Sequence, residues 1–380
     1  MKKNITFLVL LSVFAFAKAQ QAFHNFGNVQ IHDQGQVGFH IDLINDGDFN
    51  DNLGLVGFYN SNEALSISGS EIPRFFDSEI DVINNLFLDI TTEISNSLTF
   101  TNGLVITPRN NINISLSFLD DSVYLFENDN RHTDGYASYS GNNEFIFPIG
   151  DDNKLRPLIT PFQNSISRFD AAYFNEDPNS PSTFNNSFNT DNSEGIIGTV
   201  SNDEFWDFNG VQETEVTLTW DIQSRINELT DDLSNLRVVG WDNIKNEWVS
   251  LGNTDFTGNF NSGTITSETF IPSKFEIITF GSLVSSDDII VHDGISPNGD
   301  GINDFFIIKG IEAFENTLEI YNRLQRLVFR ATNYQNDWDG ISNQNGTISQ
   351  ENRLPSGVYY YIVELPEVGR SFSGPLYLTN

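Results

Sequence analysis

Short runs of alternating apolar and polar residues recur along the whole chain, and they constrain its fold more than any other feature. Every second residue is apolar in EVTLTWDI (215–222), and FEIITF (275–280) and VYYYIVEL (358–365) have similar strand texture. In residues 224–236 the apolar residues recur at helix-like spacing, which fits a short helix or a loop over a sandwich edge. The sequence therefore predicts an all-β protein.

The first nineteen residues have the pattern of a secretory signal peptide. Lys2 and Lys3 precede an apolar run over 5–16, and Ala-Lys-Ala at 17–19 is a small-x-small cleavage site. The apolar run is shorter than the roughly 20 residues that span a bilayer. We expect residues 1–19 to be removed, a mature chain that begins at Gln20 or Gln21, and secretion through the inner membrane.

Composition excludes several classes of function. The chain has no cysteine, which rules out a disulfide framework, thiol catalysis and thiolate metal sites. Its formal net charge of -33 repels phosphate backbones and anionic lipids, so binding to nucleic acid or to a membrane through a basic patch is not expected. The same charge attracts divalent cations, or simply forms a solvated acidic exterior.

The chain is long enough for more than one domain, and its texture suggests three. Residues 20–150 contain brief, closely spaced strands and predict a short-stranded β-sandwich or a solenoid-like region, although no exact repeat period is present. Residues 151–285 predict a middle β-sandwich, and its polar stretch 175–195 is a long surface loop or a linker. Residues 289–380 have the size of one immunoglobulin-like β-sandwich.

An Asn-, Asp- and Gly-rich loop lies in ISPNGDGINDFFIIKG, residues 295–310. Its side-chain oxygens could supply hard ligands to calcium, although no bidentate glutamate follows at the position that an EF-hand requires. Alternatively, these side chains bond their own backbone in Asx turns. The calcium hypothesis concerns Asn298, Asp300, Asn303 and Asp304. No other cofactor is indicated.

Four ordered blocks in the last ninety residues resemble a known family. They are SPNGDGINDFF (296–306), LEIYNRLQRLVFR (318–330), NDWDG (336–340) and LPSGVYYYIVEL (354–365). Together they resemble the gliding motility-associated C-terminal domain of Bacteroidetes, the type B sorting domain of the type IX secretion system. The matching motif residues are Ser296, Pro297, Asn298, Gly299, Asp300, Gly301, Asn303, Asp304, Tyr321, Asn322, Arg323, Trp338, Gly340, Pro355, Gly357 and Tyr359.

The sequence departs from this family at two places. The family commonly has Trp-Gly where Leu324 and Gln325 stand, and it often closes on a basic residue where this chain has GPLYLTN. From the residues themselves, we expect a hairpin around 322–326, a strand that begins at Phe305 and a Trp338 that caps the sandwich. The segment GPLYLTN is a candidate for edge pairing with a partner strand.

The resemblance implies partners and a location. Sorting domains of this type engage the type IX translocon and a PorP/SprF-type outer-membrane β-barrel protein. We therefore expect the chain at the cell surface, on the outer face of the outer membrane. An extracellular glycan or another surface ligand is a further candidate partner.

No catalytic constellation stands out in the sequence. The five histidines lack the spacing of a metalloprotease, and neither a nucleophile elbow nor a phosphate loop is present. His24, His32 and His40 recur at intervals of eight, which could form a zinc site or leave three unrelated histidines on strands and turns. The segment EFWDF (204–208) could bind sugar or pack in a core.

We expect a non-enzymatic cell-surface protein exported by the type IX system. Its last domain would act as translocation and retention signal, and the upstream domains as an adhesin or as an accessory subunit of the export and gliding machinery. The alternative is a secreted polysaccharide hydrolase or carbohydrate-binding protein with the same sorting domain, because abundant carboxylates allow a glycosidase pair.

Overall fold

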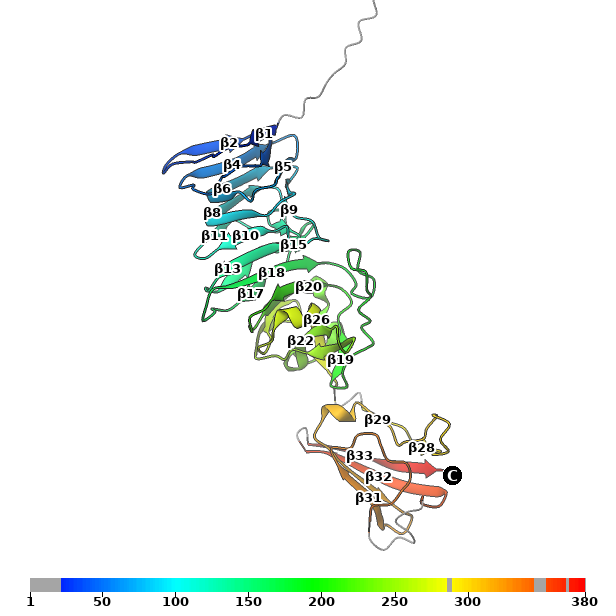
Figure 1. Cartoon of the computed structure of the whole chain (residues 1–380). Helices are drawn as coiled ribbons and strands as arrows, with labels where there is room; N and C mark the ends of the chain where they lie inside the picture. The colour runs from blue at the N-terminus through cyan, green and yellow to red at the C-terminus, as the bar shows by residue number, and fades with distance from the viewer. Residues whose placement is uncertain (1–21, 286–288, 345–352, 367–368, 380) are drawn as a thin grey trace, which may run out of the picture.

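The computed structural model describes residues 22–285, 289–344, 353–366 and 369–379, and the expected signal peptide lies outside them. The regular secondary structure of the described chain is almost entirely β-strand, which confirms the all-β prediction (Figure 1). The segment with helix-like spacing forms one helical turn, α1 (Ile226–Leu229), between the 3-10 turns η1 (Ile222–Ser224) and η2 (Leu233–Asn235).

The N-terminal region is a β-solenoid in which successive strands alternate between two parallel sheets. The first sheet contains β1 (Ala22–Asn25), β3 (Asp42–Asn45), β5 (Leu65–Gly69), β7 (Leu86–Leu88), β9 (Val105–Ile106), β12 (Thr133–Asp134) and β15 (Ile149–Asp151), with β16 (Lys154–Leu155) antiparallel at its end. The second begins with β2 (Gln36–Phe39), β4 (Leu55–Asn60), β6 (Arg74–Val82), β8 (Thr92–Asn102), β10 (Leu116–Leu119) and β13 (Ala137–Gly141), and β11 (Val123–Leu125) pairs with β8. The structure thus selects the solenoid over the sandwich.

Uneven coils explain why the sequence shows no exact repeat. Leu43 pairs with Ile67, whereas Leu86 pairs with Val105, so the number of residues per coil changes along the solenoid. Aromatic side chains stack inside it instead of following a strict motif. The rings of Phe39 and Phe58 are stacked at 5.4 Å between centroids. Stacked aromatic pairs add to the stability that burial gives each ring.

The second sheet continues from the solenoid into the middle region without a break. Strand β13 pairs in the antiparallel sense with β18 (Ser167–Phe174), and the sheet goes on through β20 (Phe205–Gly210), β26 (Phe275–Leu283), β22 (Leu236–Asp242) and β23 (Glu247–Ser250), with β19 (Ile197–Val200) beside β26. A further sheet contains β14 (Phe145–Phe147), β17 (Leu158–Thr160), β21 (Thr217–Asp221), β25 (Ser262–Thr266) and β24 (Asp255–Asn259). The turn η3 (Pro272–Lys274) precedes β26.

One hydrophobic core links the solenoid to the middle region. Buried side chains from Ile31 to Phe280 belong to the same cluster. Residue 150, the predicted end of the N-terminal domain, lies within strand β15, and both the second sheet and the core continue past it in sequence. Whether 20–150 and 151–285 fold as separate units stays a prediction.

A buried ionic cluster also joins the two regions. Glu204, directly before β20, is fully buried, and its Oε2 atom lies 3.0 Å from Arg156 Nε and 2.5 Å from the Tyr173 hydroxyl that donates to it. Arg156 also lies 2.9 Å from Asp221 on β21. Nε and Nη2 of Arg156 form no hydrogen bond, so the contacts of Arg156 with the two carboxylates are ion pairs. Buried charges persist only when they are paired in this way.

The last part of the chain has a core of its own. A five-stranded sheet has the order β28 (Gly294–Ile295), β33 (Arg370–Leu378), β32 (Gly357–Leu365), β30 (Thr317–Tyr321) and β31 (Leu327–Thr332), and β27 (Ile290–Val291) pairs with β29 (Ile308–Lys309). The turn η4 (Ile311–Ala313) follows β29. Its buried cluster runs from Ile289 to Leu378 and is distinct from the upstream core.

The polar stretch 175–195 is a packed surface loop. Phe188 is fully buried, its ring lies 5.7 Å from that of Trp241, and its carbonyl accepts a hydrogen bond from Trp248 Nε1. These contacts hold the loop against β22 and β23. Of the two interpretations that the sequence allowed, the structure supports the surface loop.

Candidate functional sites

The loop of the predicted sorting motif is folded by its own side chains. Asp304 accepts hydrogen bonds from the backbone N–H groups of Gly299 at 2.7 Å and Gly301 at 2.8 Å. These bonds lower the pKa of the Asp304 carboxyl. Asn298 Oδ1 accepts from Asp300 N, and the amide of Asn298 donates to the Asp300 carboxylate, each at 2.9 Å. Such bonds form Asx turns without a metal ion.

The structure does not test the calcium hypothesis. Asn303 has a φ of 55°, and its carbonyl accepts from the backbone N–H of Ser296 at 2.8 Å, which closes the base of the loop. Asp300 and Asp304 are already bonded to backbone N–H groups, yet carboxylate oxygens have further lone pairs. Calcium at this loop therefore stays a prediction.

Trp338 and Gly340 connect the loop to the last strand. Trp338 is 2% exposed, and its indole N–H donates to the carbonyl of Ile341 at 2.8 Å. Gly340 has a φ of 91°, and a Cβ there would lie 3.1 Å from Leu378 and 3.8 Å from Pro297. The first and third motif blocks thus meet at this glycine, beside strand β33. Trp338 belongs to the buried core of this part of the chain.

The hairpin of the second block forms as expected, between β30 and β31. Asn322 Oδ1 accepts from the backbone N–H groups of Leu324 and Arg326 and holds the turn. Leu324 is 87% exposed at its tip, and Gln325 has a φ of 58°, a value that glycine tolerates best. Tyr321 donates to Glu319 at 2.6 Å, and Arg323 is exposed.

The fourth block begins β32 with a turn, as expected. The hydroxyl of Tyr359 donates to the carbonyl of Pro355 at 2.9 Å and closes the turn over Gly357. By contrast, the strand expected at Phe305 begins only at Ile308, and Phe305 lies in the preceding bend with 47% exposure. Its neighbour Phe306 is buried in the core.

Strand β33, which contains most of GPLYLTN, has one partly covered edge. It pairs with β32 along its full length, but with β28 only at Tyr377 and Leu378. The N–H of Tyr377 points to β28, since it donates to the carbonyl of Asp293. Strand residues two apart face the same way, so the ring nitrogen of Pro375 lies on that edge, where a missing donor is tolerated.

The three evenly spaced histidines do not gather at one site. His24 bonds Asp46 at 2.7 Å, and His40 bonds the carbonyl of Tyr59 at 3.0 Å. Within the described residues, one group of three potential metal ligands is close together, and it contains no histidine: Asp134, Asp151 and Asp152. The guanidinium of Arg109 lies 2.5 Å from Asp134 and 3.0 Å from Asp151 and forms an ion pair with each of them.

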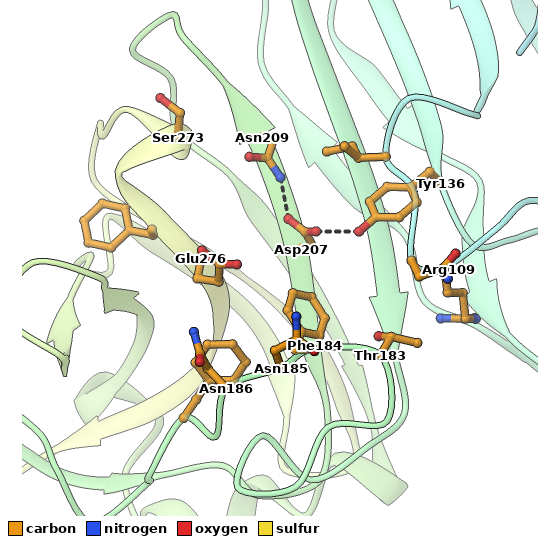
Figure 2. Close-up of a pocket in the computed structure, with 14 residues that line it drawn as sticks. Arg109, Tyr136, Thr183, Phe184, Asn185, Asn186, Asp207, Asn209, Ser273 and Glu276 are labelled. Atoms are coloured by element: carbon orange, nitrogen blue, oxygen red, sulfur yellow. Dashed lines mark hydrogen bonds between the residues drawn. The ribbon is translucent and has the colours of Figure 1, made fainter.

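A polar cavity of about 380 Å³ lies where the solenoid meets the middle region. Five separate chain segments line the cavity, so no local sequence motif predicts it. Figure 2 shows Tyr136 and Asp207 side by side, with residues of the 175–195 loop facing them. The lining residues are Arg109, Asn110, Ile112, Tyr136, Thr183, Phe184, Asn185, Asn186, Phe188, Asp207, Asn209, Ser273, Phe275 and Glu276.

Asp207 is the most perturbed acid in this cavity. Its pKa is raised to about 7: burial is the largest cause, the hydrogen bond from Tyr136 opposes the rise, and the nearby charge of Glu276 adds to it. Tyr136 donates to Oδ2 at 2.5 Å, and the amide of Asn209 donates to Oδ1. Perturbed acids in a cavity indicate a functional site. Asp207 belongs to the segment EFWDF, a candidate for sugar binding from sequence, whereas no sequence pattern indicates its partners.

The described chain thus combines a β-solenoid fused to a sandwich with a separately cored β domain that carries the sorting motif. Residues 289–378 match the CHU_C type IX secretion signal domain. This match confirms the type B sorting domain of Bacteroidetes, and the chain is a cell-surface protein exported by the type IX secretion system, with whose machinery it interacts. No curated protein and no solved structure matches the chain.

Across the described ranges, the structure contains no helix of sufficient length and hydrophobicity to span a membrane. The longest stretch of α-helix there, α1, has four residues.

Proposed function

We propose that the protein is a non-enzymatic adhesin of the cell surface, or an accessory subunit of the export and gliding machinery. The observation that carries this proposal is the continuous sheet that joins solenoid and sandwich upstream of a separately cored sorting domain (Figure 1). A body with one core is rigid, so it can hold a binding surface away from its attachment point. This suits attachment or scaffolding.

Retention at the outer membrane is part of the proposal. We infer that a PorP/SprF-type outer-membrane β-barrel protein holds the sorting domain after export. The partly covered edge of β33 supports this, because an added strand could pair with it next to β28. Pro375 would leave one backbone bond of that ladder unmade.

The test is recovery of partners from outer membranes of a Bacteroidetes host with a type IX system. An affinity tag inserted after the exposed Asn164 avoids the packed 175–195 loop. The intact chain should recover the translocon and a barrel of this type, whereas a chain that ends at residue 285 should recover neither. Soluble release of the intact chain without a membrane partner would contradict retention. Unchanged cell attachment and gliding after deletion of the gene would contradict both proposed roles.

A polysaccharide hydrolase is the second candidate, because Asp207 and Glu276 line the same cavity. The geometry of Asp207 supports binding over catalysis. It is 7% exposed, and its two oxygens accept hydrogen bonds from Tyr136 and Asn209. A catalytic acid or nucleophile must instead reach the glycosidic bond. Release of reducing ends from polysaccharides, abolished by Asp207→Asn or Glu276→Gln, would favour the hydrolase.

A further inference from the structure

We propose that the cavity at the junction of solenoid and sandwich binds one neutral sugar residue of an extracellular glycan. The inference rests on the proposed adhesin function and names its ligand class. The cavity of about 380 Å³ lies within the range of small-molecule sites, and it lies between two structural regions, where such sites are common.

The lining offers hydrogen-bond donors and acceptors in similar number. A carboxamide has two donors and an acceptor oxygen, and a hydroxyl has one donor and two acceptor lone pairs. A sugar hydroxyl both donates and accepts, so this mixture suits a polyol better than a ligand with one kind of group. The groups are the amides of Asn110, Asn185, Asn186 and Asn209 and the hydroxyls of Thr183 and Ser273.

Asp207 acts as a positioning residue beneath these groups. Its carboxylate accepts from the Asn209 amide, so Asn209 turns its nitrogen to Asp207 and its oxygen away, as Figure 2 shows. The same carboxylate holds the hydroxyl of Tyr136. Both polar side chains therefore have fixed orientations before a ligand arrives, which reduces the entropy lost on binding.

The 175–195 loop forms the opposite wall, and it is anchored. Asn185 and Asn186 are exposed, whereas Phe188 is buried and its backbone N–H donates to the carbonyl of Pro178 at 2.9 Å. The half-buried ring of Phe184 packs edge to face with Phe174 at 5.4 Å and also lines the cavity. An aromatic surface beside amides provides a packing face for the C–H groups of a sugar ring.

Charge argues against an anionic ligand. Arg109 is the one cationic side chain of the lining, and Asp134 and Asp151 already pair with it. Glu276 also lines the cavity and gives it acidic character. The amide of Asn243 donates a hydrogen bond of 2.6 Å to its carboxylate. A phosphate or an acidic sugar would meet repulsion there, whereas a neutral sugar would not.

The experiment is saturation-transfer NMR on the mature chain with glucose, galactose, mannose, fucose and N-acetylglucosamine. Glucuronate and glucosamine are the charged comparators. We expect saturation transfer to at least one neutral sugar. The double variant Asn185→Ala, Asn186→Ala should bind that sugar about tenfold more weakly, since two hydrogen bonds are removed. The matched control is Asn164→Ala, an exposed asparagine away from the cavity, which should bind as the parent does.

Each other outcome overturns the inference. These are no transfer to any neutral sugar at millimolar concentration, equal binding by the double variant, and stronger binding of glucuronate or glucosamine. Surface display and cell attachment, measured on the same variants, separate this inference from the proposed function. Normal display and attachment without sugar binding would contradict the sugar site alone. Normal display with no contribution of the protein to attachment would contradict the proposed adhesin function.

Discussion

The hydroxyl of Tyr136 donates a 2.5 Å hydrogen bond to the buried carboxyl of Asp207, across 71 positions of sequence. Tyr136 lies between β12 and β13 of the solenoid, whereas Asp207 lies on β20 of the middle region. The bond therefore joins the two regions at the wall of the cavity. A change in the charge of Asp207 should therefore alter the stability of both the solenoid and the middle region.

The stability of the protein should depend on the ionisation of Asp207. Burial raises its pKa from 3.8 to about 7, so the folded state favours the protonated acid. The contribution of this group to the free energy of unfolding should fall as pH rises from about 4 to about 7, by on the order of 2–4 kcal/mol. Asp207→Asn should remove that fall. Urea unfolding at pH 5 and pH 8 measures it.

The matched control for this comparison is Asp255→Asn. Asp255 is exposed on β24, away from the cavity, so its replacement should leave the pH dependence of stability unchanged. Equal pH dependence in the parent and in Asp207→Asn would show that Asp207 is ionised without cost in the folded protein. The assignment of Asp207 as a buried acid with a raised pKa would then be wrong.

The Glu204 cluster should be the most sensitive ionic site. Glu204→Gln leaves Arg156 and Lys154 without their shared counter-charge in a buried place. Loss of one partner of a buried pair costs about 3–5 kcal/mol. Denaturant unfolding of the mature chain should show this loss. Lys245→Ala, which removes an exposed pair with Glu247, should cost less than about 1 kcal/mol. Equal effects of the two variants would contradict a structural role for the cluster.

Local patterns in the sequence predicted some features and missed others for physical reasons. The β30–β31 hairpin and the turn before β32 depend on neighbouring residues such as Asn322 and Pro355, so the local sequence predicts them. The sequence does not distinguish the solenoid from a sandwich, because the coils vary in length and leave no exact repeat. The cavity was missed, because Tyr136 and Asp207 meet only through the pairing of β13, β18 and β20.

Thermal unfolding should separate residues 22–285 from residues 289–379. The solenoid and the sandwich share a core, whereas the sorting domain has a different one. We expect two calorimetric transitions in the mature chain, and a chain that ends at residue 285 should lose one and keep the other. A separate transition for residues 20–150 would instead show that the solenoid folds independently of the sandwich.

Gly340→Ala should destabilise the sorting domain. The φ of 91° disfavours a side chain, and the new Cβ would lie 3.1 Å from Leu378 on β33. We expect a loss of about 1–2 kcal/mol in the sorting-domain transition and reduced surface display. Gly357→Ala is the control, since its Cβ would meet only the carbonyl of Pro355 at 3.9 Å. Full surface display of a measurably destabilised Gly340→Ala variant would show that export tolerates a weakened fold.

Chelation decides between the two interpretations of the 296–304 loop. Asp304 already accepts two backbone hydrogen bonds, so we expect the sorting-domain Tm to be the same with and without chelator. Asp304→Ala should lower that Tm in both conditions, because Gly299 and Gly301 lose their acceptor. Since these bonds lower the pKa of Asp304, its contribution is present above pH 3.8 and disappears as pH falls through the lowered pKa.

Calcium binding would give a different pattern in the same melts. A bound ion stabilises the folded state by mass action, so chelator would lower the Tm of the parent chain. Asp304→Ala would remove a ligand, and its Tm would then respond little to chelator. That pair of results would establish a calcium site at Asn298, Asp300, Asn303 and Asp304. If chelator changes the Tm of neither the parent chain nor the Asp304→Ala variant, the Asx turns alone explain the structure of this loop.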